Sequence, residues 1–406
     1  MCIRNRVASL FWALCIVVFC ATLTQAAPTP AKFHIGVVTG TVNQGEDEVR
    51  GAEAMIAEYG DVKDGGMIQH VTYPNNFAAE QETTISQIVS LATDPMVKAI
   101  VMNQAVPGAT EGFRRVREMR PDILLLAGVA QEDPLVIGKV ADLVMRNDFV
   151  SVGYRVIWAA KQLGADTFVH ISFPRHMSVE TLTRRRMIFE QVCNDLGIKW
   201  VFETAPDPLS DVGVVGAQQY LLENVPKWVE KYGKNASFYC TNDAHTEPLI
   251  RQVVEFGGTF IEASLPSPLL GFPGALGIDL SNEQGNFPAI MKKIEDVLVA
   301  KNAGGRLGTW SYSFPFCATT GLIQHAINVV EGNSKMTDMQ DILKAFSKYT
   351  PGAKWGGSYY VDGTTGVKLD NYVLLLQDTY IFGRGYIGSA AIDVPEKYLK
   401  ISSGLN

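Results

Sequence analysis

Short apolar runs alternate with amphipathic stretches along the chain from about residue 32 onward. Residues 33–39 form a continuous apolar run, which is typical of a buried strand, and residues 46–59 place apolar side chains on one helical face. The same alternation continues through the strands 67–73, 99–103 and 123–127, the helices 80–91 and 110–119, and an edge strand at 140–145. This order predicts an α/β lobe built on a mostly parallel sheet.

A second series of the same kind begins near residue 151. It comprises the helices 152–163, 179–196, 215–232 and 247–256 and the strands 167–172, 199–204, 237–240 and 259–262. Two such series predict two lobes, each a mostly parallel sheet flanked by helices and hinged around a cleft.

The chain after the second series starts with residues 264–274, which are rich in Pro and Gly and which we interpret as a connector rather than an element. Helical spacing resumes at 287–300 and 319–330, and a strand, a turn and another strand are expected within 358–376. If the connector returns the chain to the first lobe, more than one crossing joins the lobes. The predicted domains are residues 32–150 with about 275–406 for the first lobe, and 151–274 for the second.

The first residues have the order of a secretory signal peptide: Arg4 and Arg6, an apolar run over 7–21, and small residues at 24–27. The run is shorter than the roughly 20 apolar residues that a membrane helix needs. We therefore expect residues 1–26 to be removed and the protein to be periplasmic or extracellular. Lipid attachment at Cys20 is the alternative, although bulky Phe19 precedes it where a small residue is expected.

Charge and cysteine content exclude several classes of function. The net charge is −7 and no basic run occurs, which argues against a nucleic-acid partner. Three cysteines remain after the leader, Cys193, Cys240 and Cys317, and their wide spacing matches neither a disulfide framework nor a metal site. The chain also lacks the common nucleophile-elbow, phosphate-loop, dinucleotide and zincin motifs. We therefore expect no enzymatic activity, no metal and no cofactor.

Three short segments resemble type I periplasmic binding proteins, the sugar- and amino-acid-binding group. They are the first strand 35–39 with its polar loop, the strand 238–241 that ends in Asn242-Asp243, and the helix that contains 184–186 and leads to Leu196-Gly197-Ile198. The resemblance covers nearly the whole mature chain in element order, and segments 83–88 and 170–176 are similar to an uncharacterised bacterial branch. It implies the two-lobed fold, and it implies that the Asp at position 243 contacts ligand. The tail after Trp355 and Pro248 depart from the sugar binders.

In open parallel sheets a ligand binds beyond the carboxyl ends of the strands, so the loops at those ends predict the site. These loops are dense in amides and hydroxyls, which both donate and accept hydrogen bonds. The alternative interpretation is that the same residues cap helices and form turns. The predicted ligand-binding residues are Thr41, Asn43, Gln44, Asn76, Phe77, Asn103, Gln104, Gln131, Ser172, Arg175, His176, Asp207, Asn242, Asp243, Trp310 and Tyr312.

Four of these residues have specific roles and specific alternatives. Arg175 can clamp an anionic group with two hydrogen bonds, or it can form a surface ion pair. Asp243 can accept from ligand hydroxyls or an amine, or it can cap the next helix. Trp310 and Tyr312 share one side of an extended segment and can stack on a ring, or they can pack between the lobes.

The sequence therefore predicts an exported solute-binding protein that captures a small polar molecule by hinge closure and delivers it to an inner-membrane ABC permease. A sugar, nucleoside, flavin or amino-acid-like compound would fit the predicted site, and a monomer is expected. Two alternatives stay open: a ligand-sensing partner of a signalling protein, and an exported α/β enzyme that would use a titratable pair such as Asp207 with His176.

Overall fold

The computed structural model describes residues 31–404. The predicted signal peptide and the lipidation alternative at Cys20 lie outside the described residues. Among the helices that are described, none combines the length and the apolar character that crossing a membrane requires.

The first lobe contains a seven-stranded sheet with the order β11-β12-β5-β4-β3-β1-β2. Its strands are β1 (His34–Thr39), β2 (Ile68–Thr72), β3 (Val97–Asn103), β4 (Leu124–Gly128), β5 (Leu143–Asn147), β11 (Trp355–Val361) and β12 (Lys368–Gln377). All neighbours run parallel except the hairpin of β11 and β12. The prediction of an edge strand at 140–145 is wrong, because β12 returns from the C-terminal part of the chain and pairs with β5.

Both faces of this sheet are covered, which explains its continuous apolar strands. On one face, Ile35 and Val37 pack in a core with Ala318 and Leu322. The neighbouring residue Val38 points to the opposite core. The helices of this lobe are α1 (Val42–Tyr59) and α12 (Phe314–Val330) on the first face, α2 (Gln81–Leu91) and α3 (Ala109–Met119) on the second, and α13 (Met339–Lys348) beside α12 and β11.

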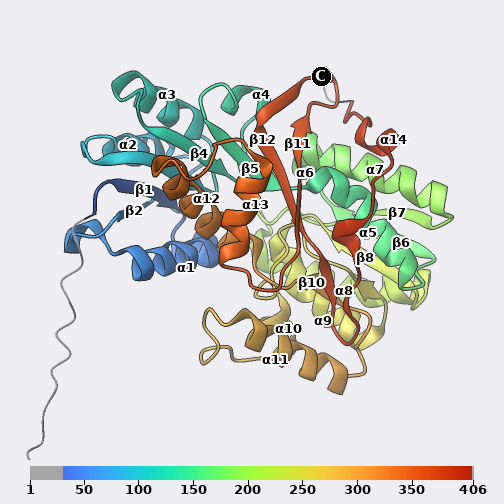
Figure 1. Cartoon of the computed structure of the whole chain (residues 1–406). Coiled ribbons are helices and arrows are strands. Elements are labelled where there is room, and N and C mark those ends of the chain that lie inside the picture. Colours follow the sequence, from blue (N-terminus) through green and yellow to red (C-terminus); the bar gives the residue numbers. More distant parts are fainter. Residues whose placement is uncertain (1–30, 405–406) are drawn as a thin grey trace, which may run out of the picture.

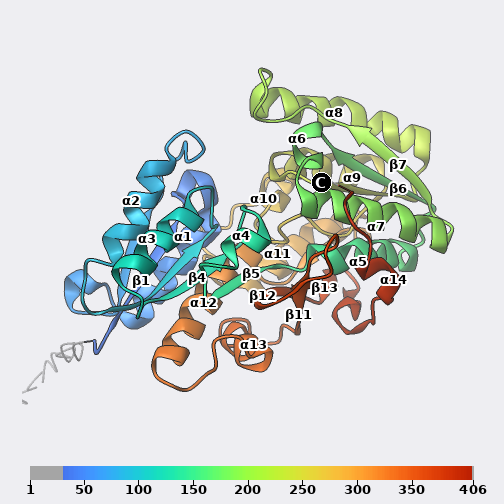
Figure 2. The same ribbon diagram turned by 90° about the horizontal axis from the view of Figure 1, so that it is seen from above.

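The second lobe contains a parallel four-stranded sheet of order β7-β6-β8-β9. Its strands are β6 (Thr167–Ser172), β7 (Lys199–Thr204), β8 (Ala236–Cys240) and β9 (Thr259–Phe260), and its main helices are α5 (Phe149–Gln162), α7 (Glu180–Leu196), α8 (Gly213–Tyr232) and α9 (Thr246–Phe256). Phe168 packs on Phe189 of α7, whereas Val169 shares a core with Leu221 of α8 and Leu249 of α9. The two lobes lie side by side in Figure 2.

Three segments of the chain run between the lobes: 147–149, 260–314 and 377–379. A small sheet of β10 (Gly308–Trp310), β13 (Thr379–Ile381) and β14 (Gly385–Tyr386) lies between them. The carboxylate of Glu262 accepts hydrogen bonds from the Trp310 indole and the Thr379 hydroxyl, both at 3.1 Å, and so links two of the crossings. The exact lobe boundaries near residues 150 and 275 stay predictions.

The connector is structured, unlike the prediction. It contains the five-residue helix α10 (Phe272–Leu276), which packs on α9 and leads to α11 (Phe287–Ala300). The Phe272 ring contacts Phe260 and Phe382 edge-on and anchors the connector in the core. Figure 1 shows α10 and α11 together at one edge of the molecule.

The C-terminal residues pack against the second lobe. A buried arginine of α7, Arg184, donates hydrogen bonds to the backbone carbonyls of Val361, Leu399 and Ile401. The Tyr398 ring lies 5.2 Å from Tyr154 of α5. The remaining short elements are α4 (Pro134–Ile137), α6 (Pro174–Met177), α14 (Glu396–Leu399) and the 3-10 turns η1 (Val62–Asp64), η2 (Asp243–His245) and η3 (Ser389–Ala391).

Candidate ligand-binding site

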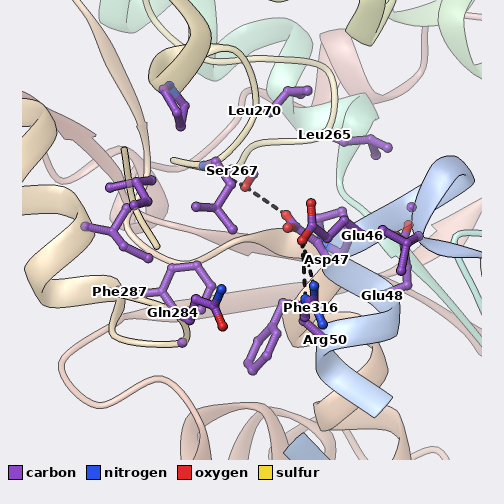
Figure 3. Close-up of a pocket in the computed structure, with 18 of the residues that line it drawn as sticks. Glu46, Asp47, Glu48, Arg50, Leu265, Ser267, Leu270, Gln284, Phe287 and Phe316 are labelled. Carbon is purple, nitrogen blue, oxygen red and sulfur yellow. Dashed lines mark hydrogen bonds and ion pairs between the residues drawn. The ribbon is translucent and has the colours of Figure 1, made fainter. Parts of the chain in front are cut away.

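A pocket with a volume of about 950 Å³ opens at the start of α1. Its walls come from three places: the first turns of α1, the connector with the start of α11, and the start of α12. Asp243 of the second lobe also lines it. Figure 3 shows side chains of α1 facing side chains of the connector across the cavity. The volume falls within the roughly 300–1,000 Å³ typical of small-molecule sites.

The first turn of α1 brings acidic side chains to this pocket. Gly45 has the extended angles φ −165° and ψ 85°, which interrupt the helix. A β-carbon at Gly45 would lie 2.0 Å from Oε2 of Glu48, so this position has room for the Glu48 carboxylate only because it is glycine. Glu46, Asp47 and Glu48 follow directly and all line the pocket.

Asp47 ties α1 to the other two walls. Its Oδ2 accepts a hydrogen bond from the Ser267 hydroxyl of the connector at 3.0 Å, and it also accepts from the Ser313 hydroxyl at the start of α12. Burial raises the pKa of Asp47, and these two hydrogen bonds oppose the rise.

Glu48 is 2% exposed. Its Oε1 accepts a hydrogen bond of 2.7 Å from the Gln104 amide at the end of β3. Burial raises the pKa of Glu48 to about 7, and the negative charges of Asp47 and Asp243 add to the rise. The carboxyl is therefore partly protonated near neutral pH.

Asp243 reaches the pocket from the end of β8. The preceding Asn242 accepts a hydrogen bond from the Ala244 amide at 2.9 Å and so takes the capping role, which leaves the Asp243 carboxylate facing the pocket. Asp243 is exposed to solvent at the pocket. The protein atoms around its carboxylate nevertheless raise its pKa to about 6 by desolvation, and the charge of Asp47 adds to the rise. Among the described residues no side chain or amide donates a hydrogen bond to it or forms an ion pair with it.

Part of the pocket wall is apolar. It is formed by Leu265, Leu269, Leu270, Ile278, Phe287, Ile290 and Phe316. The Phe287 and Phe316 rings contact each other edge-on with centroids 5.3 Å apart, which gives this wall a fixed shape. The pocket therefore combines charged and apolar surface, and Asp279, Ser281 and Gln284 before α11 also line it.

The structure brings four of the predicted residues to this pocket: Asn43, Gln44, Gln104 and Asp243. Two more lie directly beside them. Thr41 precedes α1, and the Gln131 amide donates to the Gln104 side chain at 3.1 Å. These residues follow the carboxyl ends of strands, as the sequence rule expected for a ligand site, and ligand binding by them stays a prediction.

Other predicted residues are engaged by protein partners. Arg175 forms a two-bond ion pair with Asp207, at 2.6 and 2.9 Å. The hydroxyl groups of Ser172 and Thr241 lie 2.7 Å apart, and Thr241 is also 3.1 Å from Nδ1 of His176. These side chains belong to the strand-end loops of the second lobe but do not line the described pocket.

The predicted aromatic residues are packed in the protein. Trp310 is 1% exposed, and the Tyr312 hydroxyl donates to the Pro351 carbonyl at 2.8 Å. Phe77 packs edge-on against Tyr73. Two remaining predicted residues lie outside the pocket: Asn103 is buried and donates to Pro315 and Thr319, and Asn76 sits in the turn after β2.

Sequence reasoning missed most of the pocket wall. It placed the loop up to Gln44 in the site but stopped before Asp47 and Glu48, and it treated the connector as a passive link. One signal was available: Gly45-Glu46-Asp47-Glu48 puts a helix-breaking residue before three successive acids. The apolar wall had no local signal, because leucines in a Pro/Gly-rich segment are also typical of packed loops.

The two-lobed α/β architecture, with a pocket lined by residues of both lobes, defines the class of fold. It is the fold of type I periplasmic binding proteins, as the sequence resemblance predicted. A structure described as a proposed transcriptional regulator from Clostridium difficile 630 matches 86% of this chain and 99% of its own, with a TM-score of 0.74 and 23% identity. A looser match is an ABC transporter solute binding protein from Clostridium phytofermentas with bound L-rhamnose, with 88% and 98% coverage, a TM-score of 0.48 and 11% identity.

Within this class, the chain belongs to the family described as "Protein of unknown function (DUF3798)", whose model matches residues 33–308. A relative from Treponema pallidum (strain Nichols), described as an uncharacterized protein, is 40% identical over 220 residues, which are 54% of this chain and 100% of the relative. A second uncharacterized protein of the same organism is 44% identical over 178 residues, 43% of this chain and 80% of its own.

Proposed function

We propose that the chain is an exported solute-binding protein that captures a small molecule in the pocket at the start of α1 and delivers it to a membrane transporter. The observation that carries this proposal is the pocket itself, which has walls from the first lobe and the connector and a carboxylate from the second lobe. A ligand held by groups of both lobes favours the conformation in which those groups are closest.

The arrangement of the chain also supports capture by hinge closure. Hinge motions are absorbed by a few residues between rigid bodies. Three crossings join the two sheets, and two of them, 147–149 and 377–379, are short, which supports a hinge at this place. Binding and release require no covalent step. Removal of residues 1–26 and an inner-membrane permease as partner are parts of the same proposal.

The test is to block the pocket. The folded full chain is purified from its native cells, compounds released from it are identified by mass spectrometry, and the ligand-stripped protein is titrated with them by calorimetry. We expect binding at one site. Leu270→Trp places a large ring in the pocket and should weaken binding at least about tenfold, which corresponds to 1.4 kcal/mol.

A matched control is Val136→Trp, because Val136 is exposed on α4 and lies outside the pocket. It adds the same ring and should leave affinity unchanged. A compound that binds Leu270→Trp as tightly as the parent protein would show that this pocket is not the site. A protein from which no compound is released, and which binds none of those tested, would contradict the proposed function.

A further inference from the structure

The charges that line the pocket are strongly unbalanced. One cationic side chain lines it, Arg50, against the carboxylates of Glu46, Asp47, Glu48, Glu53, Asp243 and Asp279. Arg50 is already paired on the exposed side of α1, with Glu46 at 3.1 Å and Glu53 at 2.7 Å. No guanidinium or ammonium among the described residues pairs with the three inner carboxylates.

These inner carboxylates are Asp47, Glu48 and Asp243. The hydrogen bonds given to Asp47 and Glu48 come from neutral serine and glutamine groups, and Asp243 receives none among the described residues. Placing carboxylates in a desolvated site without a cation is costly, and proximity of like charges adds to the cost. Glu48 is buried, Asp47 is partly buried and Asp243 is exposed at the pocket. No cationic side chain of the described residues pairs with them, and this excess of charge of one sign in one pocket points to a ligand of the opposite sign.

The remaining surface of the pocket narrows the kind of cation. Among residues 31–404, no group of three or more His, Cys, Asp or Glu side chains comes together as metal ligands would. Part of the pocket wall is apolar and aromatic, with Leu265, Leu270, Phe287 and Phe316 (Figure 3). A hydrated metal ion would gain nothing from that wall, whereas a hydrocarbon or ring would bury apolar surface against it.

We propose that the ligand is an organic cation: a protonated amine, amidine or guanidine carried on an apolar body. Its head group donates hydrogen bonds to Asp47, Glu48 and Asp243, and its body lies against the leucines and phenylalanines of the connector and the start of α12. Charge-assisted hydrogen bonds of this kind are about twice as strong as neutral ones. This inference rests on the proposed function, because it assigns the ligand class of the same pocket.

The test uses three probes that share one body and differ in the charge of the head group: 4-methylbenzamidinium, 4-methylbenzamide and 4-methylbenzoate. Binding to the ligand-stripped full chain is measured at pH 8 by calorimetry and by ligand-observed NMR, with L-rhamnose as a neutral sugar probe. We expect the amidinium to bind at least about tenfold more tightly than the amide, and the benzoate and the sugar not to bind. Glu48→Gln and Asp243→Asn should each weaken amidinium binding by about tenfold.

The matched control is Glu118→Gln. It neutralises an exposed glutamate of α3 that is paired with Arg114 and lies outside the pocket, so affinity should not change. Amidinium affinity that survives both Glu48→Gln and Asp243→Asn would overturn the proposal. An amide, benzoate or sugar that binds as tightly as the amidinium would also overturn it. If Leu270→Trp abolishes the binding of that neutral or anionic probe, the pocket and the proposed function stand, and only the assignment of a cationic ligand fails. Absence of binding by all four probes together with release of no compound would overturn both.

The dependence of amidinium binding on pH is a second measurement. Glu48 and Asp243 take up protons as the pH falls through about 7 and about 6, so cation affinity should decrease from pH 8 to pH 5. A neutral ligand that accepts a hydrogen bond from a protonated carboxyl would show the opposite trend and would contradict the proposal. The ionisable groups around these two carboxyls are Glu46, Asp47, Arg50, Glu53, Tyr73, Cys240 and Asp279.

Discussion

At the scale of single residues, the buried carboxyl group of Glu48 lowers the stability of the folded state when it is ionised. Its pKa is about 7 in the folded protein against an ordinary value of 4.5, because burial disfavours the charged form. Between pH 4.5 and 7 the folded state keeps a proton that the unfolded state has lost. The stabilising contribution of this group is therefore fully present below pH 4.5 and is lost as the pH rises through 7.

Glu48→Gln should consequently stabilise the ligand-free protein at high pH. We expect the free energy of unfolding to rise by up to about 3 kcal/mol at pH 8, since each pKa unit corresponds to about 1.4 kcal/mol. At pH 4 the difference should vanish, because both states are then protonated. Urea unfolding at the two pH values measures the change, and a variant no more stable than the parent at pH 8 would contradict this account.

Arg175 is a residue whose role in the structure differs from the role that the sequence predicted. Arg175 was predicted to clamp an anionic ligand, and it lies at the predicted strand end, but its guanidinium is paired with Asp207 and is 44% exposed. Asp243 was predicted on the same kind of argument and does line the pocket. The sequence around the two positions does not distinguish them, because the outcome depends on which partner is nearby in space.

At the scale of elements, α7 holds the C-terminal part of the chain through one side chain. Arg184 is 2% exposed. Its three hydrogen bonds to backbone carbonyls join α7 to the end of β11, to the last residue of α14 and to Ile401 just after it. A buried guanidinium that satisfies several carbonyls is difficult to replace, because each carbonyl then loses its donor.

We expect Arg184→Ala to reduce the free energy of unfolding by about 3 kcal/mol and to make the last ten residues susceptible to protease. Arg114→Ala is the control, since Arg114 pairs with Glu111 and Glu118 on the exposed surface of α3 and such pairs contribute about 1 kcal/mol or less. Chemical unfolding and limited proteolysis of both variants provide the measurement. Equal losses in the two variants would show that the tail does not depend on Arg184.

At the scale of the whole molecule, we expect the charge of the ligand to determine how closely the two lobes approach each other. Asp47 and Glu48 belong to the first lobe and Asp243 to the second. The charge of Asp47 raises the pKa of Glu48 and of Asp243, and the charge of Asp243 raises that of Glu48. Their repulsion opposes approach of the lobes while the site holds no cation. A bound cation removes the repulsion and adds attraction from both sides, so it favours closure.

Small-angle X-ray scattering should show this effect directly. Saturation with the ligand identified by mass spectrometry should reduce the radius of gyration of the full chain. The double variant Glu48→Gln, Asp243→Asn should be more compact than the parent in the absence of ligand, because neutral side chains no longer repel. A radius of gyration that is unchanged by saturating ligand would contradict closure of the lobes around this pocket.

The sequence by itself determined the local structure and the class of fold. Continuous apolar runs such as residues 35–38 and the helical spacing of residues 46–59 depend only on which side chains must be buried. Two successive series of such elements were enough to predict two α/β lobes. That a ligand binds beyond the strand ends stays a prediction, although Gln44, Gln104 and Asp243, which follow β1, β3 and β8, do line the candidate pocket.

Only the tertiary structure decided which residues enclose the pocket and which chemical groups line it. The pocket joins residues near position 45 with others near 243, 270 and 316, and no local pattern carries the distances among them. The same reason places β5 inside the first sheet, because β12 returns to it from more than two hundred residues away. The raised pKa of Glu48 is also non-local, since desolvation and unpaired charge depend on what the rest of the chain brings near that carboxylate.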